Sequence, residues 1–328
     1  MRRLTYADID AARHTRGQTV LLFLTDRCPV GCAHCSVDSR PDSPKIRDFA
    51  RFEEVIDGLC ASSYGLVGIS GGEPFIERRG LSHATARLRA AGKDISIVTS
   101  GVWATTDDPP GWITEVLGRC GCVVLSTDIF HSDALPDERF VHAARTIARA
   151  GVWVVTQVIE DPEAERHAVD MLTRAFGTGW TEYAEIRSAP LLPYGRAADL
   201  FQPTATTEGR DFGPCYLARS PVIRYDGTMS VCCNEAVIMG RGPESLRRAC
   251  TTADDLGEAF ADLDRHALFR AIADAGPGVL TLDPRLSDMA DRGYRSICEM
   301  CWEMAERVGD AADDPIFRAT SRLTAETP

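Results

Sequence analysis

The sequence lacks any apolar run that approaches the roughly 20 residues a membrane-spanning helix needs. Its first residues, MRRLTYADIDAARHTRG, also lack the apolar stretch of a secretory signal peptide. Basic residues are in deficit, with 36 Lys and Arg against 48 Asp and Glu and a formal net charge of −12. This balance argues against nucleic-acid backbones as partners and favours cationic ligands. We therefore expect a cytoplasmic protein that binds neither membranes nor nucleic acid.

Cysteine, by contrast, is plentiful, with 12 residues in a chain of 328. A disulfide framework is not expected in a cytoplasmic protein, because the cytosol keeps thiols reduced. Metal or redox chemistry is the better interpretation. The cysteines also cluster along the chain, at 28/32/35, 120/122, 215, 232/233 and 298/301, with Cys60 and Cys250 standing apart.

Six apolar runs alternate with helix-like segments between residue 19 and about residue 188. Their near-continuous hydrophobicity suits parallel strands that are buried on both faces. Six βα units of this kind predict an α/β protein with either a doubly wound sheet or a barrel. In both architectures the carboxyl ends of the strands hold the ligands. The predicted strands cover 19–25, 65–70, 95–100, 122–128, 152–159 and 183–188.

Beyond residue 200 the composition changes to a connection rich in Pro, Gly and Thr. The stretch SPVIRYDGTMSVCC then predicts a hairpin with Asp226-Gly227 as its turn. Residues 243–275 are helical in character, and the tail after about residue 310 is expected to fray.

The stretch CPVGCAHC places Cys28, Cys32 and Cys35 directly after the first predicted strand. Structural zinc normally uses two separated ligand pairs, not three cysteines in one loop. His34 lies between two of the cysteines, and we assign it no chemistry. A [4Fe–4S] cluster fits this crowded loop better. With three cysteine ligands, one iron would keep an open coordination site.

C-x3-C-x2-C after the first strand, together with GGEP (71–74) after the second, resembles the radical S-adenosylmethionine (SAM) superfamily. The resemblance implies a partial (β/α)6 TIM-type barrel in which the open iron binds the amino and carboxylate groups of SAM. Reduction of the cluster would then yield a 5′-deoxyadenosyl radical that abstracts a hydrogen atom from the substrate. It also implies an electron donor such as flavodoxin or ferredoxin.

The same resemblance implies a set of SAM contacts. Glu73 would accept from the SAM ammonium group, and the two glycines before it would let the backbone approach closely. Arg139 could bind the SAM carboxylate or be a solvated arginine at a helix start. Gln157 could reach the ribose or make a purely structural hydrogen bond. The full set is Gly71, Gly72, Glu73, Ser126, Asp128, Arg139 and Gln157.

A second cysteine set resembles the opening of the SPASM extension of radical SAM enzymes, in its shorter "twitch" form. Four thiolates would hold an auxiliary [4Fe–4S] cluster in a small C-terminal α+β domain, for two clusters in all. A zinc ribbon is the alternative, and Cys233 could exchange roles with its neighbour in the set. PYGRA (193–197) resembles the segment that joins barrel and twitch domain. The ligands are Cys215, Cys232, Cys298 and Cys301.

These resemblances divide the chain into four expected parts: a helical segment over 1–18, the radical SAM partial barrel over 19–200, the twitch domain over 201–310 and a tail over 311–328.

Cys250 has no role as a cluster ligand in these two sets, although it lies in the sequence between the two halves of the second set. A cysteine S–H that returns hydrogen to a substrate radical from the opposite face would make an epimerase; a purely structural Cys250 is the alternative. Twitch-bearing relatives include aminoglycoside epimerases and aminocyclitol dehydrogenases. We therefore expect a radical SAM epimerase (an isomerase) of an aminoglycoside or aminosugar in antibiotic biosynthesis. The alternatives are a dehydrogenase of an aminocyclitol or aminosugar alcohol, a peptide-modifying radical SAM enzyme, and a zinc-stabilised binding protein. Candidate partners for substrate ammonium groups are Glu182, Glu185, Asp226 and Glu235.

Overall fold

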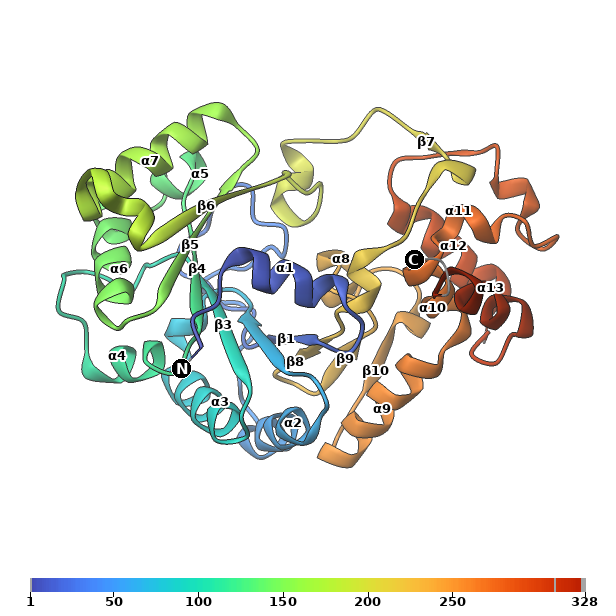
Figure 1. The fold of residues 1–328 in the computed structure, drawn as a ribbon, viewed down its shortest axis with the longest axis horizontal. Coiled ribbons are helices and arrows are strands. Elements are labelled where there is room, and N and C mark those ends of the chain that lie inside the picture. Colours follow the sequence, from blue (N-terminus) through green and yellow to red (C-terminus); the bar gives the residue numbers. More distant parts are fainter. Residues whose placement is uncertain (1, 310, 326–328) are drawn as a thin grey trace.

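A curved nine-stranded sheet organises the chain in this computed structural model, which describes residues 2–309 and 311–325 (Figure 1). The strand order is β10-β9-β8-β1-β2-β3-β4-β5-β6, and the six strands from β1 to β6 are parallel. This is the α/β sheet of a partial TIM-type barrel, and all six predicted strands are confirmed. They are β1 Thr19–Phe23, β2 Leu66–Ser70, β3 Asp94–Thr99, β4 Cys122–Ser126, β5 Trp153–Ile159 and β6 Ala184–Ala189.

Helices that follow the strands cover the outer side of the sheet (Figure 1). The first of them buries one apolar face, on which Phe52, Ile56 and Leu59 are fully buried. This helix begins where Asp48 accepts a hydrogen bond from the backbone of Arg51. The set comprises α2 Phe49–Ala61, α3 Arg78–Ala90, α4 Gly111–Leu117, α6 Asp137–Arg149 and α7 Pro162–Phe176, and the short helix α5, Ile129–Ser132, directly follows the end of β4.

The predicted N-terminal helical segment is helix α1, Tyr6–His14, which lies on the inner side of the sheet (Figure 1). A capping box between Thr5 and Asp8 starts it. Its residues Tyr6 and Ile9 pack against a small apolar cluster that includes Val124 and Val155 of the central strands. Helix α1 therefore closes part of the space inside the partial barrel.

The predicted hairpin is confirmed as strands β8, Val222–Arg224, and β9, Thr228–Ser230, with Gly227 at φ +87° in the turn. Strand β8 pairs parallel to β1, so the hairpin extends the barrel sheet. Strand β10, Arg247–Ala249, then pairs with β9 inside the segment expected to be helical. The helical expectation fails there because α9 begins only at Ala253, where Thr252 caps it with a capping box.

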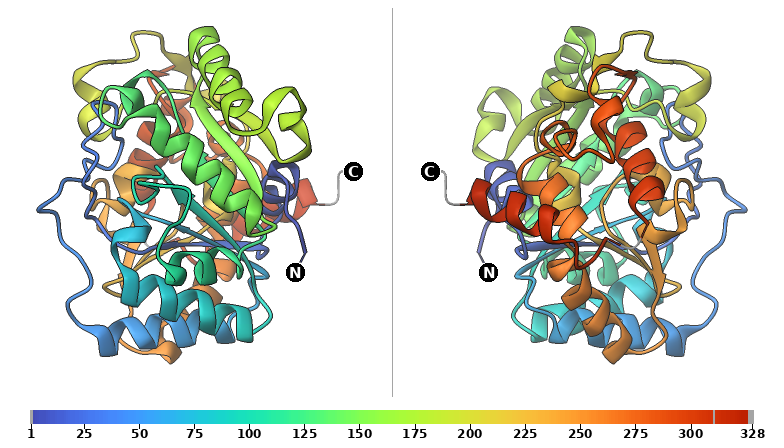
Figure 2. Two further views of the ribbon diagram at one scale, coloured as in Figure 1. Left: turned by 90° about the vertical axis from the view of Figure 1, so that its left-hand side faces the viewer. Right: turned by 90° about the vertical axis from the view of Figure 1, so that its right-hand side faces the viewer.

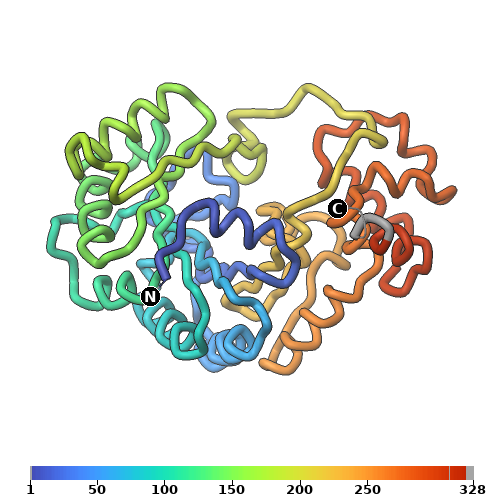
Figure 3. Tube along the Cα trace, in the orientation of Figure 1, coloured from blue at the N-terminus to red at the C-terminus, as the bar shows by residue number. Residues whose placement is uncertain are grey.

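The remaining helices gather beyond the β8–β10 edge of the sheet (Figure 2), and a long connection from β6 reaches them (Figure 3). The prediction that the tail frays is wrong for residues 315–325, which form helix α13. Its Phe317 is fully buried, and Asp314 accepts from the backbone nitrogens that start it. No helix among the described residues is long and apolar enough to cross a bilayer. The elements are α8 Glu235–Ile238, α9 Ala253–Arg265, α10 Ala267–Asp274, α11 Pro277–Leu280, α12 Ile297–Val308, α13 Pro315–Ala325, and the pair β7 Thr207–Glu208 with β11 Gly293–Tyr294.

Candidate active site

The three-cysteine loop follows β1 at the carboxyl end of the parallel sheet, as the sequence predicts. The backbone nitrogen of Cys28 donates to the carbonyl of Arg40 at 3.1 Å, and that of Cys35 donates to the carbonyl of Cys32 at 3.3 Å. All three thiols are free. Burial raises the pKa of Cys28 to about 12. A metal that binds Cys28 must therefore displace the proton of this thiol.

Gly71 and Gly72 hold the start of this loop by close backbone contact. A Cβ on Gly71, whose φ is +144°, would lie 2.5 Å from the carbonyl oxygen of Thr25, and one on Gly72 would lie 2.2 Å from that of Arg27. The nitrogen of Gly72 donates to the oxygen of Thr25 at 2.7 Å. Glycine is thus required because the cysteine loop itself occupies the space.

The carboxylate of Glu73 is completely buried and takes four donors from within the chain. Oε1 accepts from the nitrogen of Phe75 at 3.1 Å and from Oγ1 of Thr99 at 2.8 Å. Oε2 accepts from the nitrogen of Ser100 at 2.9 Å and from its Oγ at 2.6 Å. Burial raises the pKa of Glu73, although these hydrogen bonds oppose the rise. A SAM ammonium group would have to replace one of these donors.

Ser126, Gln157 and Arg187 form a row across three neighbouring strands. Ser126 is the register partner of Gln157, and Gln157 is that of Arg187. Nη1 of Arg187 donates to Oε1 of Gln157 at 3.0 Å, and its guanidinium carbon lies 4.4 Å from the Tyr6 ring centroid. Sequence reasoning missed Arg187, although its spacing along β6 gave a signal, since alternate residues share one face of a strand.

Asp128 lies under the cysteine loop and contacts two histidines. Its Oδ1 is 3.0 Å from Nδ1 of His131, and its Oδ2 is 3.4 Å from Nε2 of His34. Burial acts to raise the pKa of Asp128, but the hydrogen bonds from His131 and His34 hold it well below its usual range. Burial lowers the pKa of His131, yet Asp128 and Cys32 raise it to about 10. The sequence named Asp128 but missed both histidines as its partners.

Arg139 contacts the loop after β3, since its Nη1 donates to the carbonyl oxygen of Val102 at 2.5 Å. Its other guanidinium nitrogens have no hydrogen bond to a described residue. The structure therefore gives Arg139 a protein partner that neither of the two expected interpretations included.

Arg196, in the PYGRA segment, clamps the cysteine loop from the side of the connection after β6. Its Nε and Nη2 donate to the carbonyl oxygen of Cys32 at 3.0 and 2.7 Å. Its Nη1 donates to the carbonyl of Ser39 at 2.9 Å and pairs with Asp38 at 2.8 Å. The backbone nitrogen of Arg196 also donates to the oxygen of Cys35 at 3.0 Å. This clamp was not predicted.

The second cysteine set converges as predicted. Cys215, Cys232, Cys298 and Cys301 line one small cavity between α12 and the segment after the hairpin. Cys233 does not line it, and its sulfur instead accepts from Nη2 of Arg13 at 3.8 Å. Geometry therefore favours the first of the two adjacent cysteines as the ligand.

Sulfur spacing separates the two kinds of metal site considered for this cavity. Four sulfurs around a tetrahedral zinc, each about 2.3 Å from the metal, lie about 3.8 Å apart. Among the described residues, no three of these four sulfurs lie within 4.8 Å of one another. The same is true of the three sulfurs in the loop after β1. Both sets are spread more widely than a single zinc ion requires.

Cys250 follows β10 and lies at the same sheet edge as the cysteine loop, since its nitrogen donates to the oxygen of Gly227 in the hairpin turn at 2.8 Å. It is only 2% exposed, and its sulfur lies 4.0 Å from the carbonyl of Arg248. Burial raises the pKa of Cys250 to about 11, so the thiol stays protonated. Arg248, on the same strand face, pairs with Asp262 of α9 at 2.6 Å, which places that face toward the helices.

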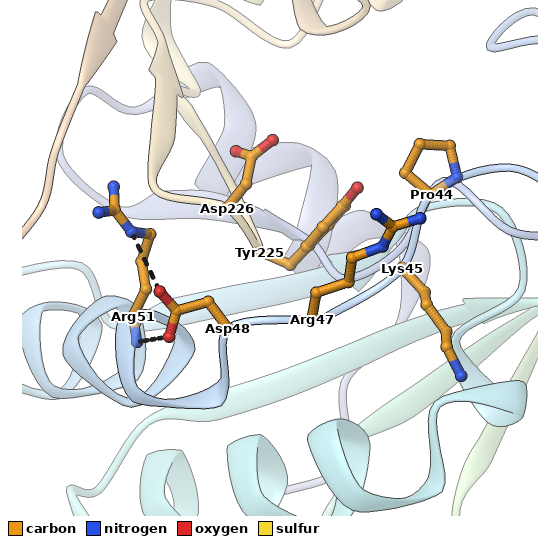
Figure 4. A pocket seen from close by; sticks show the side chains of 7 residues that line it. All are labelled: Pro44, Lys45, Arg47, Asp48, Arg51, Tyr225 and Asp226. Atoms are coloured by element: carbon orange, nitrogen blue, oxygen red, sulfur yellow. Dashed lines mark hydrogen bonds and ion pairs between the residues drawn. The ribbon is translucent and has the colours of Figure 1, made fainter.

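A cavity of about 290 Å³ lies between the hairpin turn and the chain that leads into α2 (Figure 4). Arg47, Arg51 and Tyr225 line it, together with Pro44, Lys45, Asp48 and Asp226. Cys250 lines neither this cavity nor the one with the four cysteines.

The four candidate carboxylates for substrate ammonium groups do not converge. Glu185 lies near the amino end of β6, where its Oε1 accepts hydrogen bonds from the nitrogen of Tyr6 at 2.7 Å and from Nε1 of Trp153 at 2.5 Å. Glu182 precedes β6 at that same end and is exposed. Asp226 lines the cavity in the hairpin turn, and Glu235 is the first residue of α8.

Comparison with known proteins agrees with this geometry. Residues 22–129 match the family model of the Radical SAM superfamily. A 7-carboxy-7-deazaguanine synthase of Pyrobaculum aerophilum is 34% identical over 116 residues, which are 35% of this chain and 48% of that protein. The chain thus matches about half the length of this curated relative.

Solved structures with similar folds are more distant in sequence. Streptococcus suis SuiB bound to the precursor peptide SuiA aligns at 11% identity with a TM-score of 0.49, over 82% of this chain and 72% of that chain. Native anSMEcpe with AdoMet and the Kp18Cys peptide aligns at 13% identity with a TM-score of 0.49, over 94% of this chain and 95% of that chain. BtrN in complex with AdoMet and 2-DOIA aligns at 12% identity with a TM-score of 0.38, over 92% of this chain and 93% of that chain.

Residues 22–129 thus resemble the Radical SAM superfamily, and a [4Fe–4S] cluster is the group that this resemblance predicts for the cysteine loop. The residues present fit that cluster. Three free thiols lie in one loop at the carboxyl end of β1. Buried polar atoms without a well-aligned hydrogen bond also gather around this loop, namely Asp26 Oδ1, His34 Nδ1, Ser39 Oγ and His131 Nδ1. Such atoms are expected where a bound group completes a site.

Proposed function

We propose that this protein is a radical SAM epimerase of an aminoglycoside or aminosugar, of the kind of neomycin C epimerase. Cys28, Cys32 and Cys35 would hold the cluster that binds SAM. When bound, the cluster and SAM supply the radical that removes a hydrogen atom from a sugar carbon. Ser126 and Gln157, in a row with Arg187 on adjacent strands, would line the SAM side of the site.

The observation that carries the epimerase assignment is the placement of Cys250. Its backbone is hydrogen-bonded to the hairpin turn at the sheet edge where the cysteine loop also lies. Its raised pKa keeps an S–H bond at neutral pH, and only the protonated thiol can donate a hydrogen atom. The thiol would give that atom to the substrate carbon and become a thiyl radical. One electron from flavodoxin or ferredoxin and one proton would then restore it.

Because Cys250 is buried on the face of the sheet that points toward the helices, the proposal requires that substrate binding both exposes the thiol and turns it toward the inner face. The segment that would move is the junction between β10 and α9. Its polar contact with α2 is a hydrogen bond from the nitrogen of Ala253 to Glu54 at 2.9 Å, and the bonds that Asp255 accepts from Thr251 and Thr252 lie within the segment itself. These contacts are exposed and inexpensive to break.

A second [4Fe–4S] cluster on Cys215, Cys232, Cys298 and Cys301 is also part of the proposal. The shared cavity and the wide sulfur spacing support it over zinc. The dehydrogenase remains the second candidate function, because a cluster in this position could accept the electron that a substrate radical loses on oxidation.

Turnover in deuterated water separates the two functions. An epimerase places one solvent-derived deuterium in the product, whereas a dehydrogenase gives a product lighter by two hydrogens without label. Cys250→Ala should abolish net epimerisation while 5′-deoxyadenosine still forms. Cys60→Ala on α2, another thiol whose pKa burial raises, is the matched control and should turn over normally. Unaltered epimerisation by the Cys250 variant would rule out this thiol as the donor.

A further inference from the structure

Cys32, the middle cysteine of the loop, lies near a histidine from a different strand-to-helix connection. Ring nitrogens of His34 and His131 and the sulfur of Cys32 all lie within 4.8 Å of one another. Cys32 is 8% exposed, and both imidazole side chains are 16% exposed. This group of side chains therefore lies in a largely water-free environment, where a hydrogen bond would have a strong electrostatic effect.

Asp128 lies within ion-pair distance of both rings. It is the N-cap of α5, and its Oδ1 accepts from the backbone nitrogen of His131 at 3.0 Å while lying 3.0 Å from Nδ1 of that ring. Its Oδ2 reaches Nε2 of His34 at 3.4 Å. The His34 ring also stacks on Phe130 at 4.7 Å between centroids. No lysine or arginine among the described residues pairs with Asp128, so the two imidazoles are its only ionic partners.

We infer that Asp128 and His131 are positioning residues of the radical SAM cluster: Asp128 orients the His131 ring so that it donates a hydrogen bond to the sulfur of Cys32. Such an arrangement is the counterpart of the carboxylate–histidine pairs that orient ligands in metal sites. A donor at a ligating sulfur stabilises the reduced cluster, which carries one more negative charge, and so raises the reduction potential. This inference rests on the cluster alone and not on epimerase chemistry.

The competing arrangement is direct ligation. Cys32, His34 and His131 are close enough to hold a single metal ion with one sulfur and two nitrogens. The two arrangements differ in what they leave to Asp128. As a partner of a donating ring it sets the direction of the hydrogen bond, whereas as a partner of two metal ligands it would only support them.

The test is an EPR-monitored redox titration of the full-length protein, reconstituted anaerobically, with dithionite as reductant. The signal that changes on addition of SAM identifies the cluster of the N-terminal loop. His131→Leu should lower the equilibrium constant for its one-electron reduction about tenfold, which is the size of effect that loss of an outer contact has on metal affinity. That change equals a midpoint potential about 59 mV lower. Asp128→Asn should shift the potential in the same direction by less.

His142→Leu is the matched control, because His142 makes a comparable Asp–His pair with Asp107 at 2.6 Å, away from the cysteine loop. Its potential should equal that of the unmodified protein. An unchanged midpoint in His131→Leu with normal iron content would overturn the inference. If that variant fails to bind iron, the isosteric Asp128→Asn decides in the same way.

Pulsed EPR of the reduced cluster gives an independent reading. An exchangeable proton coupling that His131→Leu removes supports the hydrogen bond. A directly coordinated nitrogen in the unmodified protein, or one zinc ion in place of the cluster, overturns it. Loss of epimerase activity has no bearing on these measurements, so the failure of the two proposals can be told apart.

Discussion

The buried contact between Asp26 and Arg224 allows the sharpest test of how the hairpin supports the cysteine loop. Asp26 lies two residues before Cys28 and is 5% exposed, and Arg224 on β8 is 8% exposed. Nη2 of Arg224 is 2.8 Å from Oδ2 of Asp26, which also accepts from the Tyr225 hydroxyl at 2.9 Å. Arg224→Met would leave the carboxylate buried with that hydroxyl as its remaining donor. Removing one partner of a buried pair costs about 3–5 kcal/mol of unfolding free energy.

Urea denaturation of the reduced, metal-free protein, followed by circular dichroism, measures this cost. The double variant Asp26→Asn with Arg224→Met should recover part of the loss, because no buried charge is left unpaired. Arg87→Met is the control: Arg87 pairs with Asp57 at 2.6 Å, but both side chains are about half exposed, so a loss of at most about 1 kcal/mol is expected. If Arg224→Met costs no more than this control, the buried pair does not stabilise the loop as argued.

Three further predictions concern neighbouring contacts. Gly72→Ala should cost about 1–3 kcal/mol in urea denaturation and reduce iron loading, because its Cβ would overlap the Arg27 carbonyl; Gly65→Ala, with nothing within 4 Å, should do neither. Arg196→Ala should lower stability by about 2 kcal/mol and the iron-to-protein ratio on reconstitution, since it loses its hydrogen bonds to the loop carbonyls. The pKa of Asp255 is lowered from 3.8 to about 2 by hydrogen bonds from Thr251 and Thr252. The contribution of Asp255 to the unfolding free energy is therefore present above pH 3.8 and lost as the pH falls toward 2. In Asp255→Asn, the urea midpoint should change less with pH across that window than in the unmodified protein.

The strands could be predicted from the sequence because parallel strands that are buried on both faces are near-continuous apolar runs, whereas an amphipathic helix has polar residues on one face. The hairpin was equally readable from its Asp-Gly turn. Strand β10 was not, because Arg247–Ala249 is short, carries two arginines and has no alternation. Only its pairing with β9 makes it a strand, and pairing is a property of the folded chain. Helix α13 was missed for a similar reason, since the burial of Phe317 depends on α10.

Within the site, the types of the functional residues could be predicted from the sequence, but the residues that contact them could not. The cysteine spacing indicated clusters of ligands, and the four cysteines of the second set line one cavity. That Glu73 would be enclosed by Thr99 and Ser100, however, follows from β3 lying beside β2. The choice between Cys232 and Cys233 likewise depends on where Arg13 of α1 lies. Contacts between distant parts of the chain decide such questions, and no local pattern encodes them.

The cysteine loop itself has little regular structure, yet its carbonyls and sulfur are held from several sides. The Gly72 segment after β2 holds its start, Arg196 after β6 holds Cys32 through its carbonyl, and Asp128 with His131 after β4 lies close to the Cys32 side chain. These contacts come from alternate strands of the partial barrel, so the loop reaches its geometry only when the sheet is complete from β1 to β6. Metal binding to such a loop adds its free energy to that of folding. Cluster occupancy should therefore stabilise the whole barrel, and not the loop alone, against denaturant.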